Sequence, residues 1–304
     1  MATLRQLEYL VTVVDQGSFT RAADMLHVTQ PALSHQIRVL ERTTGGPLLE
    51  RLPRGVRLTP TGRAMLPHAR AALADADRAR CAARQAAGLE TGELQIATLY
   101  SISLGVLPAA LKAWRKAHPD VGIRLFEHRH TDELGEAMSA GQADLAVGPA
   151  PTGWGGSVRE VGVEELVVVV AADDPAAGAT TIALAELADR SWVHYTPGHG
   201  LADVLNRACA QAGFEPRPAV HTEQTAAAPA LAAAGLGPAL VPANILPASF
   251  DGHLLRPDPP VCRTLTAYTR GEPDPLAAAF IDVLTDHAQL LPDHVAKRLD
   301  LVAT

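Results

Sequence analysis

The 304-residue chain is long enough for two or three domains, and its 47% hydrophobic content excludes global disorder. It contains no apolar run long enough to cross a bilayer and no N-terminal charged segment followed by an apolar core, so a membrane or secreted protein is not expected. The net charge of −7 is uneven, since residues 1–88 contain 12 Lys+Arg and 7 Asp+Glu while the other residues contain 14 and 26, a basic head on an acidic body.

Residues 3–44 are predicted to form three helices. Apolar residues spaced three or four apart predict the first from Thr3 to Asp15. The segment GSFTRAADMLHVTQPALSHQIRVL, residues 17–40, then indicates two short helices joined by a tight turn. Ser18 is suited to cap the first, and Pro31 suits the first turn of the second. Gly45-Gly46 supplies a stop after the second helix, near residues 43–44.

The second helix of this pair has two different faces. Leu33, Ile37 and Leu40 form its apolar stripe, whereas polar side chains suited to base edges and phosphates cover the opposite face. The alternative is an ordinary helical hairpin with a solvated polar face, because this pattern is weak by itself. The candidate DNA-binding residues of the helix pair are Ser18, Thr29, Gln30, Pro31, Ser34, His35 and Arg38.

A small β-hairpin, or wing, is predicted next from the extended runs Leu48–Arg51 and Val56–Leu58. Its arginines make it basic, and we expect Arg51 and Arg54 to reach phosphates or an adjacent minor groove. The alternative is a solvated turn that is rich in arginine by chance.

Thr59 and Pro60 open a long predicted helix that runs to about Ala87, and Gly88–Gly92 follows as a hinge. The helix is charged apart from one narrow apolar stripe, which has too little surface to bury within one subunit. We therefore expect it to pair with a second copy, the alternative being a solvated spacer. The stripe consists of Met65, Leu66, Ala69, Leu73, Ala76 and Ala83.

From Glu93 onwards, strands and helices alternate, which is the pattern of an α/β domain. Residues 165–171 form an apolar strand that could lead into a second lobe, and residues 264–269 are expected to return to the first. The predicted strands are 94–99, 121–127, 144–148, 165–171, 192–195, 219–222, 238–241 and 264–269, and the predicted helices are 103–118, 131–140, 201–212, 224–234 and 275–291.

Several stretches resemble one family. LRQLEYLVTVVDQGSFTRAADMLHVTQPALSHQIRVLE and PLLERLPRGVRLTPTGRAML closely resemble the DNA-binding domain of LysR-type transcriptional regulators, almost continuously from Leu4 to Leu66. LPAALKAWRKAHPDVGIRL, AGQADLAVG and LAAAGLGPALVP are similar to the two-lobed effector domain of that family, which is like type 2 periplasmic binding proteins. The chain departs from the family at Leu49, where Phe is usual, and at Gly45-Gly46, where Leu-Gly is common.

The resemblance implies a bacterial, sequence-specific DNA-binding regulator. The expected domains are a winged helix-turn-helix at 1–59, a linker and dimerisation helix with its hinge at 60–90, and an effector-binding domain at 91–304. Its lobe I would comprise about 91–162 and 268–304, and lobe II about 163–267. The implied partners are double-stranded operator DNA, a small-molecule co-inducer, RNA polymerase and further copies of the chain, forming a dimer through the linker helix and a homotetramer. No cofactor or metal is expected.

In such a fold, strand ends and helix N-termini face a cleft between the lobes and favour anions or polar small molecules. By resemblance, Ser101 occupies a position that often touches effector. Arg129, with a histidine on each side, hints at a carboxylate-bearing or pH-sensitive ligand. Helix capping is the alternative role for some of these residues, namely Ser103, Thr131 and Gln224. The candidate effector-binding residues are Thr98, Tyr100, Ser101, Ser103, Arg129, His130, Thr131, Thr196, Gly198, His199, Thr222 and Gln224.

Two other functional classes are less well supported. An enzyme would need a motif such as G-x-S-x-G, H-E-x-x-H, a P-loop or a G-x-G-x-x-G after a strand, and the sequence has none of these. A secreted solute-binding protein would need a signal segment. Cys81, Cys209 and Cys262 have neither disulfide-framework nor metal-site spacing, so we expect a cytoplasmic, nucleoid-associated protein that is not an enzyme.

Overall fold

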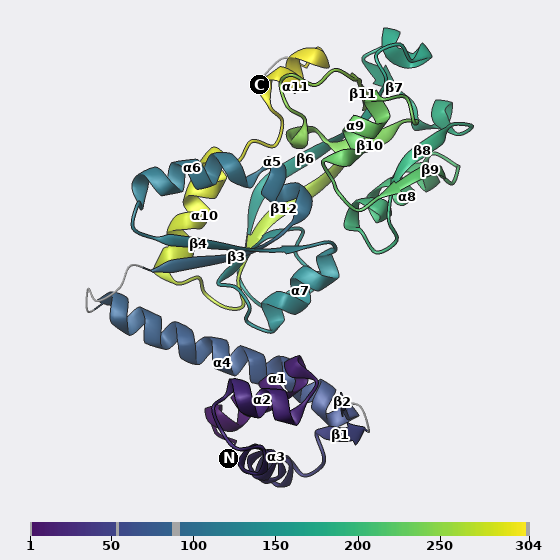
Figure 1. The fold of residues 1–304 in the computed structure, drawn as a ribbon. Helices are drawn as coiled ribbons and strands as arrows, with labels where there is room; N and C mark the ends of the chain where they lie inside the picture. The colour runs from purple at the N-terminus through teal and green to yellow at the C-terminus, as the bar shows by residue number, and fades with distance from the viewer. Residues whose placement is uncertain (1, 53–54, 87–91, 302–304) are drawn as a thin grey trace. The chain divides into compact units, whose positions relative to one another are not determined.

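The computed structural model of the chain describes residues 2–52, 55–86 and 92–301 (Figure 1). The chain divides into two compact units, one of residues 1–92 with 136–143, the other of residues 93–135 with 144–304. Below, the head means residues 2–86, and the α/β domain means residues 93–301.

The head is built on three helices, α1 (Leu4–Gln16), α2 (Phe19–Met25) and α3 (Gln30–Thr44). All three begin at the hydroxyl-bearing residues that sequence favours for this position. Thr3 caps α1 in a capping box, Ser18 caps α2 and Thr29 caps α3. The three helices enclose an apolar core in which Leu10, Val13, Leu33 and Leu40 have no exposed surface.

Residues after α3 form the predicted wing. The α3 helix ends at Gly45, whose φ of 84° is readily adopted only by glycine. Strands β1 (Leu49–Leu52) and β2 (Gly55–Leu58) then pair antiparallel. Residues 53 and 54 at the tip lie outside the described residues.

The long helix α4 (Pro60–Ala86) begins where it was predicted to begin. The Thr59 hydroxyl accepts from the Gly62 N–H at 3.0 Å and donates to the Pro47 carbonyl at 2.7 Å, which ties the start of α4 to the segment before the wing. Of the predicted hinge, residues 88–91 lie outside the described part of the chain.

The expectation that α4 cannot bury its stripe within one subunit is wrong for the first half of the helix. Ala69 is 1% exposed, and Met65 and Leu73 pack against the same core, which lies alongside α1. Sequence pattern alone does not show which neighbour covers an apolar stripe. Of the later stripe residues, Ala76 is half-buried, and the Ala83 side chain is not among those described.

The α/β domain is organised around an eight-stranded sheet in the order β4-β3-β5-β12-β6-β11-β7, with β10 also pairing with β6. Strands β3, β4 and β5 run parallel, whereas β6 is antiparallel to β10, β11 and β12. A separate parallel pair consists of β8 (Ser191–Tyr195) and β9 (Arg217–Thr222). The strands of the larger sheet are β3 (Glu93–Leu99), β4 (Gly122–His128), β5 (Leu145–Gly148), β6 (Val158–Val170), β7 (Thr181–Ile182), β10 (Ala239–Pro242), β11 (His253–Pro257) and β12 (Val261–Tyr268).

Helices divide between two lobes of this domain (Figure 1). Lobe I, around β3 to β5, has α5 (Tyr100–Gly105), α6 (Leu107–Ala117), α7 (Thr131–Ser139) and α10 (Pro275–His287). Lobe II has α8 (Gly200–Gln211), α9 (Ala227–Ala233) and α11 (Asp293–Arg298), with 3₁₀ turns at Pro175–Gly178, Leu184–Leu187 and Ala243–Ile245. One predicted helix, 103–118, is thus two helices, the first of which begins three residues earlier, at Tyr100.

Two long strands belong to both lobes. Strands β6 and β12 pair antiparallel from Val158 opposite Tyr268 to Leu166 opposite Val261. The predictions of 165–171 and 264–269 found only part of each strand, because Arg159, Glu160 and Glu164 interrupt the apolar pattern of β6. Strand β11 was not predicted.

The last helix, α11, corrects the expected lobe boundary. Residues 268–304 were all expected in lobe I, but Val295 and Leu299 of this segment lie in the apolar core of lobe II, with Leu166 and Leu254. His294 Nε2 also lies 2.8 Å from the Leu246 carbonyl oxygen. The expectation is therefore wrong for α11, whose few apolar residues carry no sequence sign of which lobe they cover.

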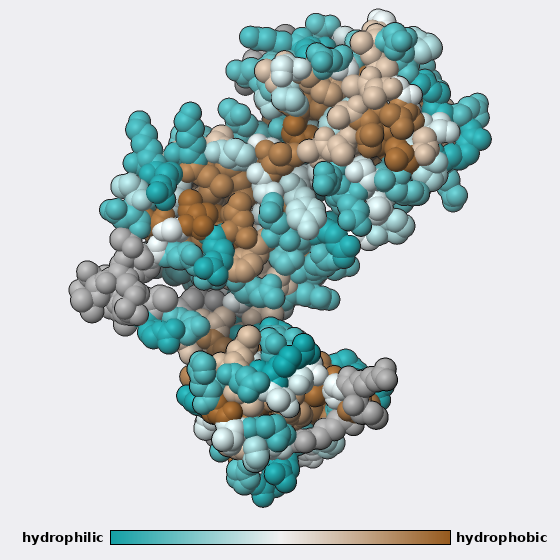
Figure 2. Space-filling view, viewed as in Figure 1, coloured by the Kyte–Doolittle hydropathy of each residue, from teal (hydrophilic) through white to brown (hydrophobic). Residues whose placement is uncertain are grey.

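No helix in the described part of the chain is both long enough and apolar enough to span a membrane. On the face drawn in Figure 2, brown apolar areas lie over the α6–α10 region of lobe I and over lobe II. Large apolar side chains that are exposed in the α/β domain include Leu104, Val163 and Leu236.

Candidate DNA-binding and effector sites

The exposed face of α3 carries two arginines and a histidine beside a groove. His35, Arg38 and Arg42 line a groove of about 730 Å³ together with the turn at residues 45–47. Arg38 donates from Nε to the Ser34 carbonyl at 3.4 Å, and no described residue pairs with the Arg42 side chain. Arg42 was not predicted, although its place one helical turn after Arg38 would have put it on the same face.

The placement of Ser34 on that exposed face is wrong. Ser34 is 6% exposed and borders a second groove, of about 390 Å³, with Phe19, Ile37 and Arg38. It follows Leu33 and lies three residues before Ile37, so it falls at the edge of the apolar stripe. Of the other candidates, Gln30 is half-buried and Pro31 is exposed, whereas the hydroxyls of Ser18 and Thr29 are used as helix caps.

The wing is attached to α3 by Glu41, a residue that the sequence did not single out. The Glu41 carboxylate accepts from the backbone N–H groups of Leu48 and Leu49, at 2.9 and 3.2 Å. Arg57 of the wing pairs with Glu50 at 2.6 Å across the hairpin. Of the two predicted phosphate contacts, Arg54 lies outside the described residues, as does the side chain of Arg51.

A buried polar network occupies the junction of the two lobes. Arg263 of β12 forms an ion pair with Glu164 of β6 and donates from Nη2 to the Ser101 hydroxyl of α5 at 2.8 Å. The Asn244 amide donates to Glu164 at 2.8 Å. Glu164 has no exposed surface and Arg263 is 11% exposed in its side chain. A carboxylate this deeply buried is tolerated only because it is paired and hydrogen-bonded.

Ser101, which the resemblance gave as a position that often touches effector, lies at the lobe junction, and its partners there were missed. Glu164, Arg263 and Asn244 come from two strands and a 3₁₀ turn that are far apart in sequence, and they form no motif. Only the pairing of β6 with β12, which sets Arg263 opposite Glu164, brings them together.

His199 caps the N-terminus of α8 (Gly200–Gln211) at the same junction. Its Nδ1 accepts from the Leu201 N–H at 3.1 Å, so Nε2 carries the hydrogen and faces the Thr225 hydroxyl at 3.4 Å. The ring stacks on Tyr195, with 4.8 Å between ring centroids. Burial, together with the charges of Arg263 and Arg129, lowers the pKa of His199 below 6.5, so the ring is neutral at pH 7.

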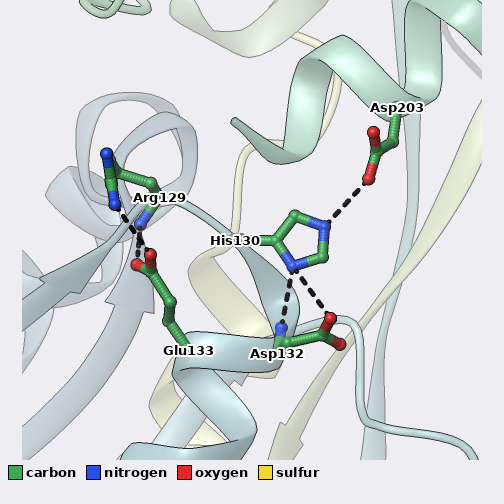
Figure 3. Close-up of polar contacts among 5 residues, drawn as sticks. All are labelled: Arg129, His130, Asp132, Glu133 and Asp203. Carbon is green, nitrogen blue, oxygen red and sulfur yellow. Dashed lines mark hydrogen bonds and ion pairs between the residues drawn. The ribbon is translucent and has the colours of Figure 1, made fainter. Parts of the chain in front are cut away.

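The loop before α7 faces the start of α8 (Figure 3). His130 Nε2 lies 2.9 Å from Asp203 of lobe II, and the Arg129 carbonyl accepts from the Gly200 N–H at 2.9 Å. The Arg129 guanidinium forms an ion pair with Glu133 of α7, in the same lobe, at 3.1 Å. A carboxylate-bearing ligand would have to compete with Glu133 for Arg129, which weakens the hint drawn from the sequence.

The other effector candidates differ in how accessible they are. Thr98 is fully buried, and its hydroxyl donates to the Val147 carbonyl at 3.0 Å, so the expectation that it faces a ligand is wrong. Ser103 does not cap a helix, because α5 already begins at Tyr100. The Tyr100 side chain is 36% exposed. Thr131 is the first residue of α7, and Thr196 and Gly198 lie just before α8. The Thr222 hydroxyl accepts a hydrogen bond from the Gln224 N–H at 3.2 Å.

Metal chemistry has no candidate site among the described residues. They contain no group of three or more His, Cys, Asp or Glu side chains placed to hold a metal ion. The cysteine thiol of Cys209 is buried and that of Cys262 is exposed, and both are free.

Both parts of the chain match family models. Residues 4–63 match the bacterial regulatory helix-turn-helix protein model of the lysR family, and residues 87–289 match the LysR substrate binding domain. The chain belongs to the LysR family of transcriptional regulators. It is a DNA-binding regulator with an effector-binding domain, and its relatives are regulators of transcription and not enzymes.

Curated relatives in the LysR family match over most of their length. The Hca operon transcriptional activator HcaR of Escherichia coli (strain K12) is 32% identical over 290 residues, which cover 93% of this chain and 97% of that protein. The regulator IlvR of Caulobacter vibrioides is 31% identical over 291 residues, covering 93% and 97%.

Solved LysR-family structures share the fold. The crystal structure of CbnR has a TM-score of 0.69 and 29% identity, covering 93% of this chain and 98% of that one. Full-length CbnR complexed with its target DNA has a TM-score of 0.66 and 28% identity, covering 97% and 99%. Full-length LysR regulators thus have the two-part architecture seen here, and members of the family bind operator DNA and small-molecule effectors and form oligomers.

Proposed function

We propose that the protein reads its operator with α3 and the wing, and that a small molecule bound where the two lobes meet controls this binding. The observation that carries the proposal is the exposed face of α3, where His35, Arg38 and Arg42 border one groove. Cations and a histidine on a helix of this kind match phosphates and base edges in a major groove. The Glu41 bonds support the proposal, because they hold the basic wing beside that helix.

For the effector, we propose a site formed by Ser101 and Arg263 with His199 and Thr225. Arg263 belongs to a strand shared by the lobes and Ser101 to lobe I, whereas His199 and Thr225 come from lobe II. A ligand that contacts all of them would favour one arrangement of the lobes over another. Tyr100, Ser103, His130 and Thr131 of lobe I, and Thr196, Gly198, Thr222 and Gln224 of lobe II, are proposed to surround it.

We also propose the wider organisation that the family implies. Residues 1–59 would bind DNA, 60–90 would pair two copies through the linker helix, and 91–304 would bind effector, with two dimers forming a tetramer. RNA polymerase would be a further partner, as expected if this chain activates transcription like the relative named as an activator. Such a protein would act in the cytoplasm, at the nucleoid.

Operator binding is tested by a mobility-shift titration with the DNA upstream of the gene's own start, at two salt concentrations. Arg38→Ala should weaken binding about tenfold and lower the slope of log K against log salt by about 0.9, as for one lost phosphate contact. Arg115→Ala removes another exposed arginine, from α6, and should leave both values unchanged. Equal binding by wild type and Arg38→Ala would contradict the proposed contact.

Effector binding is tested by thermal-shift screening with a panel of small carboxylates, phenols and amines. A compound that binds the native state raises the melting temperature, and at 100 times its dissociation constant it adds about 2.7 kcal/mol. Ser101→Val removes the acceptor used by Arg263 and should abolish the shift for the compound that works on wild type. A Ser101→Val protein that responds as strongly as wild type would remove Ser101 from the site.

A further inference from the structure

Besides the shared strands, the lobes touch where α5 meets the turn Ala243–Ile245 and, through hydrogen bonds, at the loop before α7. The loop that leads into α7 belongs to lobe I, and the first turn of α8 belongs to lobe II. Two hydrogen bonds join them, from the Gly200 N–H to the Arg129 carbonyl at 2.9 Å and between His130 Nε2 and Asp203 Oδ2 at 2.9 Å. We call these four residues the interlobe latch.

His130 is oriented by lobe I itself before it reaches lobe II (Figure 3). The Asp132 N–H, in the first turn of α7, donates to Nδ1 at 3.1 Å, so Nδ1 holds no proton in this bond. Nε2, the atom that faces Asp203, is therefore the ring nitrogen that carries a hydrogen. The side chain of His130 is 24% exposed. Its orientation is fixed because one ring nitrogen contacts Asp132 and the other contacts Asp203.

The partner surface on α8 is complementary to this loop. Gly200 is the first residue of α8, and its N–H has no acceptor within the helix, so the Arg129 carbonyl satisfies a donor that would otherwise be free. Asp203 lies in the first turn, where its charge also suits the helix dipole. Each lobe thus presents one donor and one acceptor to the other.

Close approach at Gly200 shows that the lobes touch here. A Cβ atom built on Gly200 would lie 3.4 Å from the Arg129 carbonyl oxygen and 3.9 Å from the His130 ring, which is ordinary van der Waals contact. Arg129 and Glu133 do not take part through their side chains, because they pair with each other within lobe I. The attachment at this loop therefore depends on the two hydrogen bonds.

We propose that the interlobe latch holds the lobes closed before any effector binds, and so sets the fraction of protein in the closed arrangement. The proposal rests on the proposed effector site between the lobes. An effector can shift the lobes only by its differential affinity for the two arrangements, and its apparent affinity scales with the fraction already competent to bind. The latch is thus a regulatory contact beside the ligand site, and His130 and Asp203 are positioning residues within it.

Hydrogen–deuterium exchange of the full-length protein, read at single-residue resolution without effector, tests the latch. In His130→Ala and in Asp203→Ala, the Gly200 amide should exchange about tenfold faster, the size expected when one hydrogen bond to a charged, partly exposed acceptor is lost. The double variant should exchange no faster than either single variant, because both substitutions remove the same contact.

Matched controls separate latch opening from local damage to α8. The Ala202 amide is held within lobe II by the His199 carbonyl at 2.8 Å and should keep its wild-type rate. Asp286→Ala removes an exposed carboxylate at the end of α10 and should change neither amide. His130→Gln, which keeps a donor on the side chain, should restore part of the protection at Gly200.

Two results would overturn the proposal. One is an unchanged Gly200 rate in His130→Ala, and the other is faster exchange of Gly200 and Ala202 to the same extent, which would show a purely local role in α8. The measurement uses no effector, so its failure is distinct from a failure of the effector site, which the Ser101→Val screen detects.

Discussion

His199 shows how one buried side chain couples this fold to pH. Its ring caps α8, stacks on Tyr195 and is held neutral by burial and by nearby positive charge. The pKa of His128 is lowered as well, mainly by burial. In the unfolded chain these rings regain an ordinary pKa of about 6.5.

The sign of the resulting pH dependence follows from proton uptake. Below about pH 6.5, the unfolded chain binds protons that the native chain does not, so the free energy of unfolding falls as the pH is lowered. Above that pH neither state is protonated at these sites, and this contribution to the pH dependence vanishes. The stability conferred by neutral His199 is thus complete at pH 7.5 and partly lost at pH 5.5.

His199→Asn tests this dependence. Asparagine can still cap α8 but cannot titrate, so the stability difference between pH 7.5 and 5.5 should become smaller than in wild type. Urea unfolding followed by tryptophan fluorescence reports the α/β domain, since all three tryptophans lie within it. His287→Asn, an exposed histidine at the end of α10, serves as the matched control and should behave as wild type. An identical pH dependence for His199→Asn and wild type would contradict the argument.

At the scale of elements, the two halves of α4 differ in what covers their apolar residues. Its first half completes the core of the head, where Ala69 is 1% exposed and Leu73 packs against the same cluster. Its N-terminus is fixed by Thr59, and a Cβ on Gly62 would come within 2.1 Å of the Leu48 carbonyl oxygen, so only glycine allows this approach. The stripe that the proposed pairing of two copies would use lies beyond Leu73.

Ala76→Glu tests that assignment. A charge on the stripe should reduce dimer formation, whereas alanine and glutamate have similar helix propensities and the helix itself should persist. Ala74→Glu carries the same change about 200° away around the helix, off the stripe, and should assemble as wild type. Sedimentation velocity measures both, and an unchanged mass for Ala76→Glu would place the pairing surface elsewhere.

At the scale of the whole molecule, charge distinguishes the head from the α/β domain, and sheet topology joins the two lobes of that domain. The head carries the excess of basic residues, and the α/β domain carries the acidic excess that makes the whole chain negative. Diffuse attraction to DNA is therefore confined to one end of the chain. Within the α/β domain, β6 and β12 run through both lobes, so one sheet is common to the two lobes, whereas each lobe has helices of its own.

The sequence by itself determined the features that depend on neighbours in the chain. Caps at Ser18 and Thr59, the stop at Gly45 and the alternation of strands and helices are local signals, and the structure confirmed them. The family followed from an almost continuous local match in the head. These signals are readable because backbone capping and periodicity involve residues only a few positions apart.

Only the tertiary structure decided which distant residues meet. The pairing of Arg263 with Glu164, the contact of His130 with Asp203 and the place of α11 in lobe II link segments separated by dozens of residues. The same reason explains the wrong placements of Ser34 and Thr98, whose polar side chains do not reveal that neighbouring elements cover them. Burial and long-range pairing are properties of packed layers, and no local pattern in one sequence encodes them.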